Sequence, residues 1–186
     1  TASQLFRERG FDGVGVADLM AAAGFTHGGF YKQFGSKADL MAESAACGFA
    51  QTEALAEGVD AATFVSHYLS REHRDGRATG CTMAALSGDA ARQPESVRVA
   101  FEEGVESLLA LLSQKGLTSD PADAAQARAG ILDLLAHAVG ALVLSRACPD
   151  DSPLADEILA ACRDAILGSQ RPPRPEKAKA RQRKAS

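Results

Sequence analysis

The side chains best suited to chemistry lie at the start of one short predicted helix. Thr26 precedes this helix, His27 begins it, and Lys32 follows just over one turn later, with Gly28 and Gly29 in between. Hydroxyl, imidazole and ammonium groups donate hydrogen bonds to phosphates and base edges, and the free N–H groups of a helix N-terminus also favour phosphate. Two glycines inside a helix cost about 1 kcal/mol each relative to alanine, so their presence favours a close approach of the backbone to a ligand. These features together indicate contact with nucleic acid.

Two short helices would position these groups. Residues 16–23 and 27–34 are predicted to be helical, with the turn Gly24-Phe25-Thr26 between them. Further helices at 1–9 and from 37 to about 57 would brace the pair. This arrangement is typical of a helix-turn-helix, whose second helix can enter the major groove of DNA. Helical spacing places three aromatic residues in the core: Phe25, Phe30 and Phe34.

Four short motifs follow one another in order between Phe11 and Leu40. They are Val16-Ala17-Asp18-Leu19-Met20, Ala23-Gly24-Phe25-Thr26, Phe30-Tyr31-Lys32-Gln33-Phe34 and Ser36-Lys37-Ala38-Asp39-Leu40. In this order the motifs resemble the TetR/AcrR family of bacterial transcriptional regulators. The resemblance implies a dimeric repressor that a small-molecule effector releases from a palindromic operator in double-stranded DNA, with an activator as the alternative.

The resemblance also implies roles for individual residues. Tyr31 is similar to the family tyrosine that bonds a phosphate, Lys37 to the lysine that clamps the DNA backbone, and Thr26 would cap the second helix beside a phosphate. Gly15 stands where the family usually has a serine or threonine that caps the first helix of the motif, so any phosphate contact by Gly15 is made by its backbone alone. The expected DNA-binding residues are Thr26, His27, Gly28, Gly29, Tyr31, Lys32 and Lys37.

The remainder of the chain is also predicted to be helical, which gives an all-α fold. Expected helices cover 61–72, 79–92, 94–115, 122–147 and 154–167. The fourth is apolar around nearly its whole circumference between 129 and 144, and a helix without a polar face must be covered on all sides. We therefore expect a homodimer in which the helices at about 122–147 and 154–167 of two subunits form a four-helix contact.

In the family, the helices after the helix-turn-helix enclose an effector cavity, and binding there changes the spacing of the two DNA-binding units. Cavity walls and protein cores use the same residue types, so each candidate also suits a role in the core. The candidate effector-binding residues are Phe64, His67, Tyr68, Met83, Leu86, Phe101 and His137.

Cys81 is a candidate sensor thiol, because it follows Gly80 at a predicted helix start near Arg77, and both a helix N-terminus and a cation favour a thiolate. A redox or electrophile sensor is thus one alternative, and a small buried hydrophobe is the other. Asp133 and His137 lie four residues apart and are expected to pair with each other; no metal site or cofactor is expected.

No phosphate-binding loop, nucleophile elbow or HExxH pair occurs in the sequence, which argues against a small helical enzyme. A purely structural interaction protein is a further alternative.

The composition is that of a globular protein, with 186 residues, 46% of them hydrophobic and 24% charged. The net charge of −4 argues against non-specific coating of nucleic acid but allows a local basic face. Four cysteines without a CxxC pair fit a reducing cytoplasm. The apolar stretch 131–144 is shorter than a membrane span, so no membrane partner is expected.

These observations predict three regions. A helix-turn-helix domain covers 1–47, a helical effector-binding and dimerisation domain covers 48–168, and a basic tail covers 169–186. The tail has three prolines and almost no apolar side chains, so it is expected to be solvated, with an auxiliary contact to DNA as the alternative. The chain begins without methionine inside a predicted helix, so some residues are expected to precede Thr1.

Overall fold

The computed structural model describes residues 1–115 and 124–169, and within these ranges all regular secondary structure is helical. The predicted all-α fold is therefore confirmed. The helices are α1 (Ala2–Arg9), α2 (Val16–Ala22), α3 (His27–Gln33), α4 (Lys37–Ala56), α5 (Ala61–Tyr68), α6 (Arg71–Asp75), the 3-10 helix η1 (Arg77–Thr79), α7 (Thr82–Ala90), α8 (Glu95–Gln114), α9 (Ala124–Ala147) and α10 (Pro153–Ser169).

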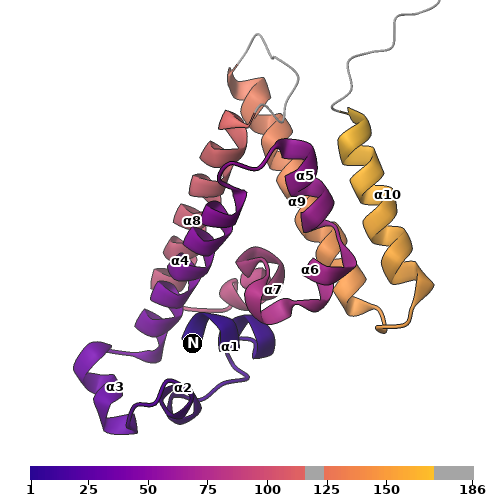
Figure 1. Ribbon diagram of the computed structural model, residues 1–186. Helices are drawn as coiled ribbons and strands as arrows, with labels where there is room; N and C mark the ends of the chain where they lie inside the picture. The colour runs from indigo at the N-terminus through magenta and orange to yellow at the C-terminus, as the bar shows by residue number, and fades with distance from the viewer. Residues whose placement is uncertain (116–123, 170–186) are drawn as a thin grey trace, which may run out of the picture.

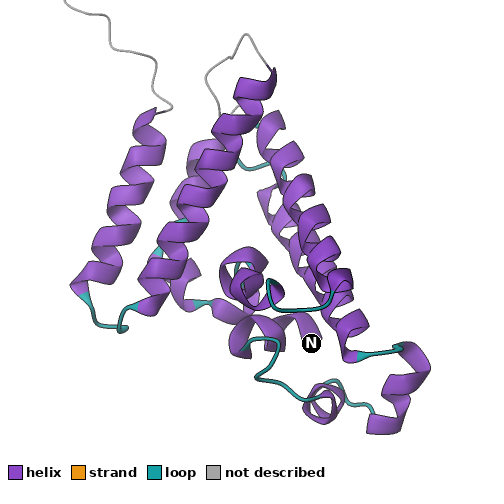
Figure 2. Cartoon of the chain, turned by 180° about the vertical axis from the view of Figure 1, so that it is seen from behind, coloured by secondary structure: helices purple, strands orange, loops and turns teal. Residues whose placement is uncertain are grey.

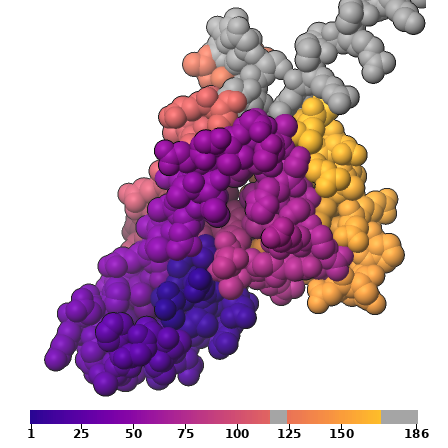
Figure 3. All heavy atoms as spheres, viewed as in Figure 1, coloured from indigo at the N-terminus to yellow at the C-terminus, as the bar shows by residue number. Residues whose placement is uncertain are grey.

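The helices form a head and a body. The head is α1–α3 with its connecting loops (residues 1–34). Within it, α2 and α3 lie at one corner of the molecule and α1 lies beside α7, while α4 leads from the head into the body beside α8 (Figure 1). The helices α9 and α10 pack together on the side away from the head, and α7 lies between the two helix pairs (Figures 1 and 2). The space-filling view likewise shows the head and α10 at opposite ends (Figure 3).

Aromatic rings join the head to the body. Phe6 of α1 contacts Phe11 with ring centroids 5.1 Å apart, Phe11 contacts Phe101 of α8 at 6.4 Å, and Phe101 contacts Phe49 of α4 at 5.4 Å. All four rings are buried. Gly104 allows α8 to approach the ring of Phe49, because a Cβ at this position would collide with it. We call these four rings the aromatic column.

The predicted helix at 61–72 is wrong in one respect, because the structure breaks it into α5 and α6. Leu69 leaves the helical conformation at φ −98° and ψ 42°, and Ser70 then caps α6 by accepting a 3.1 Å hydrogen bond from the His73 amide. Serine competes for local backbone donors in this way, which outweighs the apolar periodicity that predicts a single helix. The break turns α6 toward α9.

Helix α9 is longer and more apolar than the stretch 131–144 suggests. By length and composition it could cross a membrane, with a mean hydropathy of 1.6, so the expectation that it is too short is wrong. One such helix is weak evidence for a membrane, since a helix in a protein core or interface passes the same test. Only 22% of the apolar window is buried within the chain, and Leu132, Val143 and Leu144 are exposed. A large part of the apolar surface of α9 is therefore left uncovered by residues 1–115 and 124–169.

Candidate nucleic-acid interface and effector pocket

A tight turn fixes the angle between α2 and α3. Gly24 adopts φ +77°, which favours glycine, and the Phe25 amide donates to the carbonyl of Met20 at 2.8 Å. Thr26 is the N-cap residue of α3, as predicted, but its hydroxyl makes no capping hydrogen bond. The predicted side-chain cap is thus wrong, and within the first turn the Gly29 amide donates instead to the Thr26 carbonyl at 2.9 Å.

One aromatic residue anchors α3 and leaves its polar face exposed. Phe30 is 1% exposed and stacks on Phe34 with centroids 5.4 Å apart. Around this anchor, His27 and Lys32 are exposed, and Tyr31 is 65% exposed with its ring against that of His27. Hydrogen-bond donors therefore face outward along a helix held rigidly from behind, next to the small residues Gly28 and Gly29.

Two predictions for the expected DNA-binding region require correction or refinement. Phe25 is 67% exposed and is not a core residue; it belongs to the turn after Gly24, where helical spacing no longer applies. Lys37 is half-buried, and its Nζ donates to the Phe11 carbonyl at 2.6 Å. An ammonium has three donors, so this bond braces the start of α4 while two donors remain.

Asp89 of α7 also holds the head, which sequence reasoning missed. Its Oδ2 accepts a 3.0 Å hydrogen bond from the Phe11 amide, and its Oδ1 pairs with Arg92 at 2.9 Å. The backbone of Phe11 is thereby fixed at its N–H by Asp89 and at its carbonyl by Lys37. An isolated aspartate late in a helix gives no sequence signal for such a contact.

A pocket of about 530 Å³ lies between α4, α5, α6 and the segment from η1 to Cys81. Three candidate effector residues line it: Phe64, His67 and Tyr68. The others lie elsewhere: Met83 and Leu86 are buried in the core, Phe101 belongs to the aromatic column, and His137 is exposed on α9. The residues lining the pocket are Thr52, Leu55, Val59, Thr63, Phe64, His67, Tyr68, Glu72, His73, Gly76, Thr79, Gly80 and Cys81.

His73, which the sequence analysis missed, organises the inner wall of this pocket. Its Nδ1 lies 2.7 Å from the Tyr68 carbonyl, and its Nε2 accepts a 3.0 Å hydrogen bond from the Cys81 amide. This pattern requires a neutral ring with the proton on Nδ1. Burial lowers the pKa of His73, and electrostatic interaction with Arg146 and His67 lowers it further, while the hydrogen bond to the Tyr68 carbonyl partly opposes this.

The unfolding free energy is therefore expected to fall as the pH drops below about 6.5, the ordinary pKa of histidine. Just below this pH, His73 binds a proton in the unfolded chain but stays neutral in the folded protein. Acid therefore favours unfolding until the pH falls below the lowered pKa of folded His73. Denaturant titrations at several pH values from 7.5 to 5 measure the effect. The variant His73→Gln should show a shallower fall than the wild type, and parallel curves for the two proteins would contradict the assignment.

Cys81 lies beside the pocket in a cationic environment. It is the N-cap residue of α7 and is 2% exposed. Arg7 and Arg146 interact with it electrostatically, whereas the predicted neighbour Arg77 is exposed. The buried Tyr68 hydroxyl has no hydrogen-bond partner to nitrogen or oxygen among the described residues, and its pKa is raised well above its ordinary value by burial and by Cys81.

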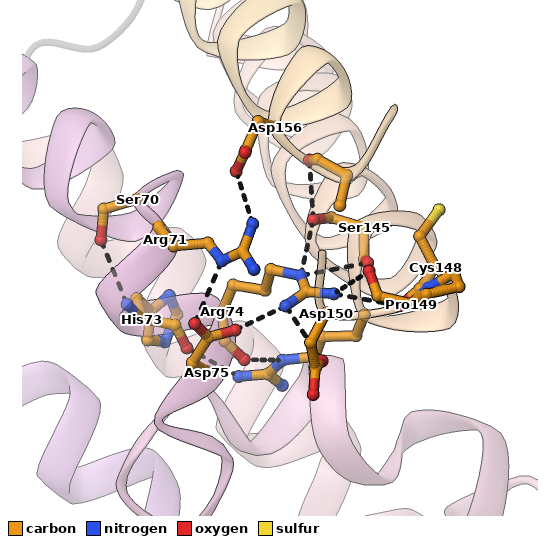
Figure 4. A network of polar contacts seen from close by, with 12 residues as sticks. Ser70, Arg71, His73, Arg74, Asp75, Ser145, Cys148, Pro149, Asp150 and Asp156 are labelled. Carbon is orange, nitrogen blue, oxygen red and sulfur yellow. Dashed lines mark hydrogen bonds and ion pairs between the residues drawn. The ribbon is translucent and has the colours of Figure 1, made fainter. Parts of the chain in front are cut away.

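Arg74 attaches the pocket to the α9–α10 unit. This arginine of α6 is 1% exposed, and it donates to the carbonyls of Ser145 and Cys148 at 3.1 and 3.0 Å and forms ion pairs with Asp75 and Asp150 (Figure 4). The neighbouring Arg71 contacts Asp156 of α10 at 2.9 Å. The short helix α6 is thus fixed to the end of α9 and the beginning of α10.

Metal ligands do not gather at either site. Within residues 1–115 and 124–169, no group of three or more histidine, cysteine or acidic side chains could hold a metal ion. Asp133 and His137 are both exposed on α9, and the structure shows no ion pair between these two described residues, contrary to the expected pairing.

Comparison with known proteins identifies the head and the fold. Residues 1–44 match the model for bacterial regulatory proteins of the tetR family. The HTH-type transcriptional repressor NemR of Escherichia coli K12 is 33% identical over 124 residues, which are 61% of this chain and 62% of NemR. The chain therefore matches about three fifths of the length of this curated relative.

Two solved structures share the fold over nearly all of the chain. The reduced form of E. coli NemR has a TM-score of 0.69 at 21% identity and covers 90% of this chain and 91% of its own. The TetR family regulator PfmR of Thermus thermophilus has a TM-score of 0.50 at 22% identity, with 92% and 97% covered. Both likenesses extend beyond the head to the helical body.

Proposed function

Because residues 1–44 match the model for bacterial regulatory proteins of the tetR family, we propose that the chain is a dimeric repressor that leaves a palindromic DNA operator when a small molecule enters the pocket between α4, α5, α6 and the segment from η1 to Cys81. The observation that supports this most is the structure of α3. Its buried face is fixed by Phe30, while its exposed face presents donors beside two glycines. A helix of this kind can lie in the major groove with its first turn at the base edges.

The proposed DNA contacts follow from this placement. His27 and Lys32 face the groove, Gly28 and Gly29 allow the backbone to approach, and the hydroxyls of Thr26 and Tyr31 and the ammonium of Lys37 bind phosphates. The basic tail at 169–186 was predicted to be solvated, with an auxiliary contact to DNA as the alternative. Apart from Ser169 at the end of α10, these residues lie outside the part of the chain that the structure describes.

Tyr31→Phe and Lys37→Gln are expected to weaken binding to every DNA sequence by about fivefold to tenfold, since each removes a phosphate contact. Lys37→Gln should also reduce the slope of log affinity against log salt by about one, because one cation fewer displaces counterions. Fluorescence anisotropy with a duplex selected by the wild type and with an unrelated duplex, at four salt concentrations, measures both effects.

Arg98→Gln is the matched control, because Arg98 is exposed on α8 outside the head. It removes the same charge and should leave the affinity and the salt slope unchanged. If Lys37→Gln behaves like this control, Lys37 serves only to brace Phe11 and does not touch DNA.

The proposed homodimer forms through α9 and α10. Leu132 and Val143 lie eleven residues apart and therefore on one face of α9, and Leu144 of α9 and Leu154 in the first turn of α10 are also exposed. Such a surface on two helices suits a four-helix contact with twofold symmetry. Two heads held by this contact match two half-sites on one side of the DNA.

The proposed effector site is the pocket beside His73. Phe64, His67 and Tyr68 line it, and its volume falls within the range of small-molecule sites. Occupation of the pocket would shift the population toward a spacing of heads that no longer fits the operator. We further propose that the protein acts in the cytoplasm and has no catalytic activity of its own.

A thiol sensor is the second candidate, favoured by the position of Cys81 between Arg7 and Arg146 at the edge of the pocket. Alkylation by iodoacetamide would form a carbon–sulfur bond with loss of iodide and of the thiol proton. If Cys81 is the sensor, this treatment should release DNA from the wild type and from Cys47→Ser but not from Cys81→Ser.

Cys47 is a suitable comparison because it is exposed, does not line the pocket and, like Cys81, interacts electrostatically with Arg7. Mass spectrometry of the treated proteins identifies the modified cysteine. Retention of DNA by wild-type protein that carries the modification on Cys81 would exclude the thiol sensor and leave reversible binding of an effector.

A further inference from the structure

We infer that Arg7 is a positioning residue that couples the wall of the effector pocket to the DNA-binding head. The inference deepens the proposed function and rests on it. Arg7 belongs to α1, yet its Nη1 donates to the carbonyl of Gly80, a residue of the pocket wall, at 3.2 Å. Its Nη2 donates to Gln51 Oε1 of α4 at 2.9 Å.

The surroundings of Arg7 are unusual for a charge needed only for stability. Arg7 is 4% exposed, pairs with no carboxylate in the part of the chain that the structure describes, and has no hydrogen-bond partner for its Nε there. An apolar side chain of similar volume is often equal to or better than a buried charge for stability. What the guanidinium provides here is a directed bond from α1 to the Gly80 carbonyl.

The residue that follows Gly80 is held by a side chain of the pocket wall. The Cys81 amide, next in the chain after Gly80, donates to His73 Nε2 at 3.0 Å, and His73 in turn contacts the Tyr68 carbonyl at 2.7 Å. His73, Tyr68, Gly80 and Cys81 all line the pocket. A molecule that displaces the His73 ring therefore releases or shifts the turn that Arg7 holds.

Two further features favour movement of the head when the turn at Gly80 shifts. Arg146 of α9 donates to the carbonyls of His73 and Arg74 at 2.9 Å each, so the backbone of α6 is fixed to α9. On the other side, α1 packs closely on α4, because a Cβ on Gly48 would collide with Thr82 and approach Ser3 of α1 to 3.1 Å. Close packing of this kind transmits a displacement and does not absorb it.

A double-mutant cycle tests the inference without knowledge of the effector. His73→Leu removes the acceptor of the Cys81 amide and imitates displacement of the ring, and Arg7→Met removes the bond to Gly80 but keeps most of the side-chain volume. We expect His73→Leu to weaken binding of a duplex, selected by the wild type from a random library, by about tenfold. In the Arg7→Met background, His73→Leu should weaken duplex binding by less than about twofold, because the hydrogen bond from α1 to Gly80 is already absent.

Arg9→Met is the matched control, since Arg9 is exposed on the same helix and contacts only Glu8 in the described chain. In this background His73→Leu should keep its full effect on DNA binding. Equal effects of His73→Leu in the Arg7→Met and Arg9→Met backgrounds would overturn the inference, as would no effect of His73→Leu in the wild type.

Hydrogen exchange of the α1 amides in DNA-free protein provides a second measurement. His73→Leu should accelerate exchange from residues 6–9 in the wild-type and Arg9→Met backgrounds and leave it unchanged in the Arg7→Met background. This result does not require DNA. If the wild type selects no duplex but His73→Leu accelerates exchange only when Arg7 is present, the proposed function fails and the coupling through Arg7 stands. If the effects of His73→Leu and Arg7→Met on exchange are additive, the coupling itself is overturned.

Discussion

Val143→Glu is expected to separate the protein into single subunits and to weaken binding of a palindromic duplex by about 100-fold or more. Val143 is 43% exposed on the uncovered face of α9, where the proposed partner subunit would bury it. A glutamate there would be buried without a partner, at a cost that a subunit contact cannot absorb. A single subunit then binds each half-site independently, and the gain from joining two binding units is typically 100-fold or more.

Val99→Glu provides the control for the loss of an exposed apolar side chain. Val99 is 42% exposed on α8 and lies outside the proposed interface, so this variant should remain dimeric and bind DNA normally. Analytical ultracentrifugation gives the oligomeric state, and anisotropy gives the affinity. A Val143→Glu protein that sediments as the dimer and keeps its affinity would show that the subunits meet elsewhere.

Arg74→Met is expected to lower the unfolding free energy by about 3 kcal/mol or more, and Tm by about 10 °C. The guanidinium donates hydrogen bonds to the carbonyls of Ser145, Cys148 and Pro149, and its Nη1 lies 3.3 Å from Asp150 Oδ1. Methionine fills most of the volume but leaves buried carbonyl groups without donors. Helix α6 would then lose its attachment to α9, so the pocket should loosen as well.

The neighbouring Arg71 offers a matched comparison on the same helix. It pairs with Asp75 and Asp156, but its side chain is 39% exposed and water can replace these contacts. Arg71→Met should therefore shift Tm by no more than about 2 °C. Thermal unfolding followed by circular dichroism measures both variants, and similar shifts for Arg71→Met and Arg74→Met would mean that burial of Arg74 adds nothing to stability.

The sequence predicted best those elements that local signals specify. Gly24 and the period of Phe30 and Phe34 are enough to place α2, the turn and α3, and the structure confirms them within a residue or two. The apolar circumference of α9 predicted a helix that one subunit leaves largely uncovered, which its 22% burial matches. Both features depend on residues close together in the chain.

Prediction failed where a local turn or cap outweighs hydrophobic spacing, and where a contact joins distant segments. The exposed Phe25 and the break at Ser70 follow from a turn and a local cap, which outweigh hydrophobic period over a few residues. The structural roles of Asp89 and Arg74 gave no signal, because the partners that define these roles, Phe11 and Ser145, lie more than 70 residues away in sequence. Of the predicted effector residues, Phe64, His67 and Tyr68 come together because they share one helix face; Met83 and Leu86 do not join them, since α7 turns that side toward the core.

The aromatic column has a consequence for exchanging parts between relatives. Phe6 and Phe11 belong to the head, while Phe49 and Phe101 belong to the body, and the two pairs meet where Phe11 contacts Phe101. A chimaera that grafts this head onto another regulator would leave that contact without a matching surface. The proposed operator specificity and the proposed effector specificity therefore cannot be recombined freely, and a working hybrid would need these four positions to be transplanted as a set.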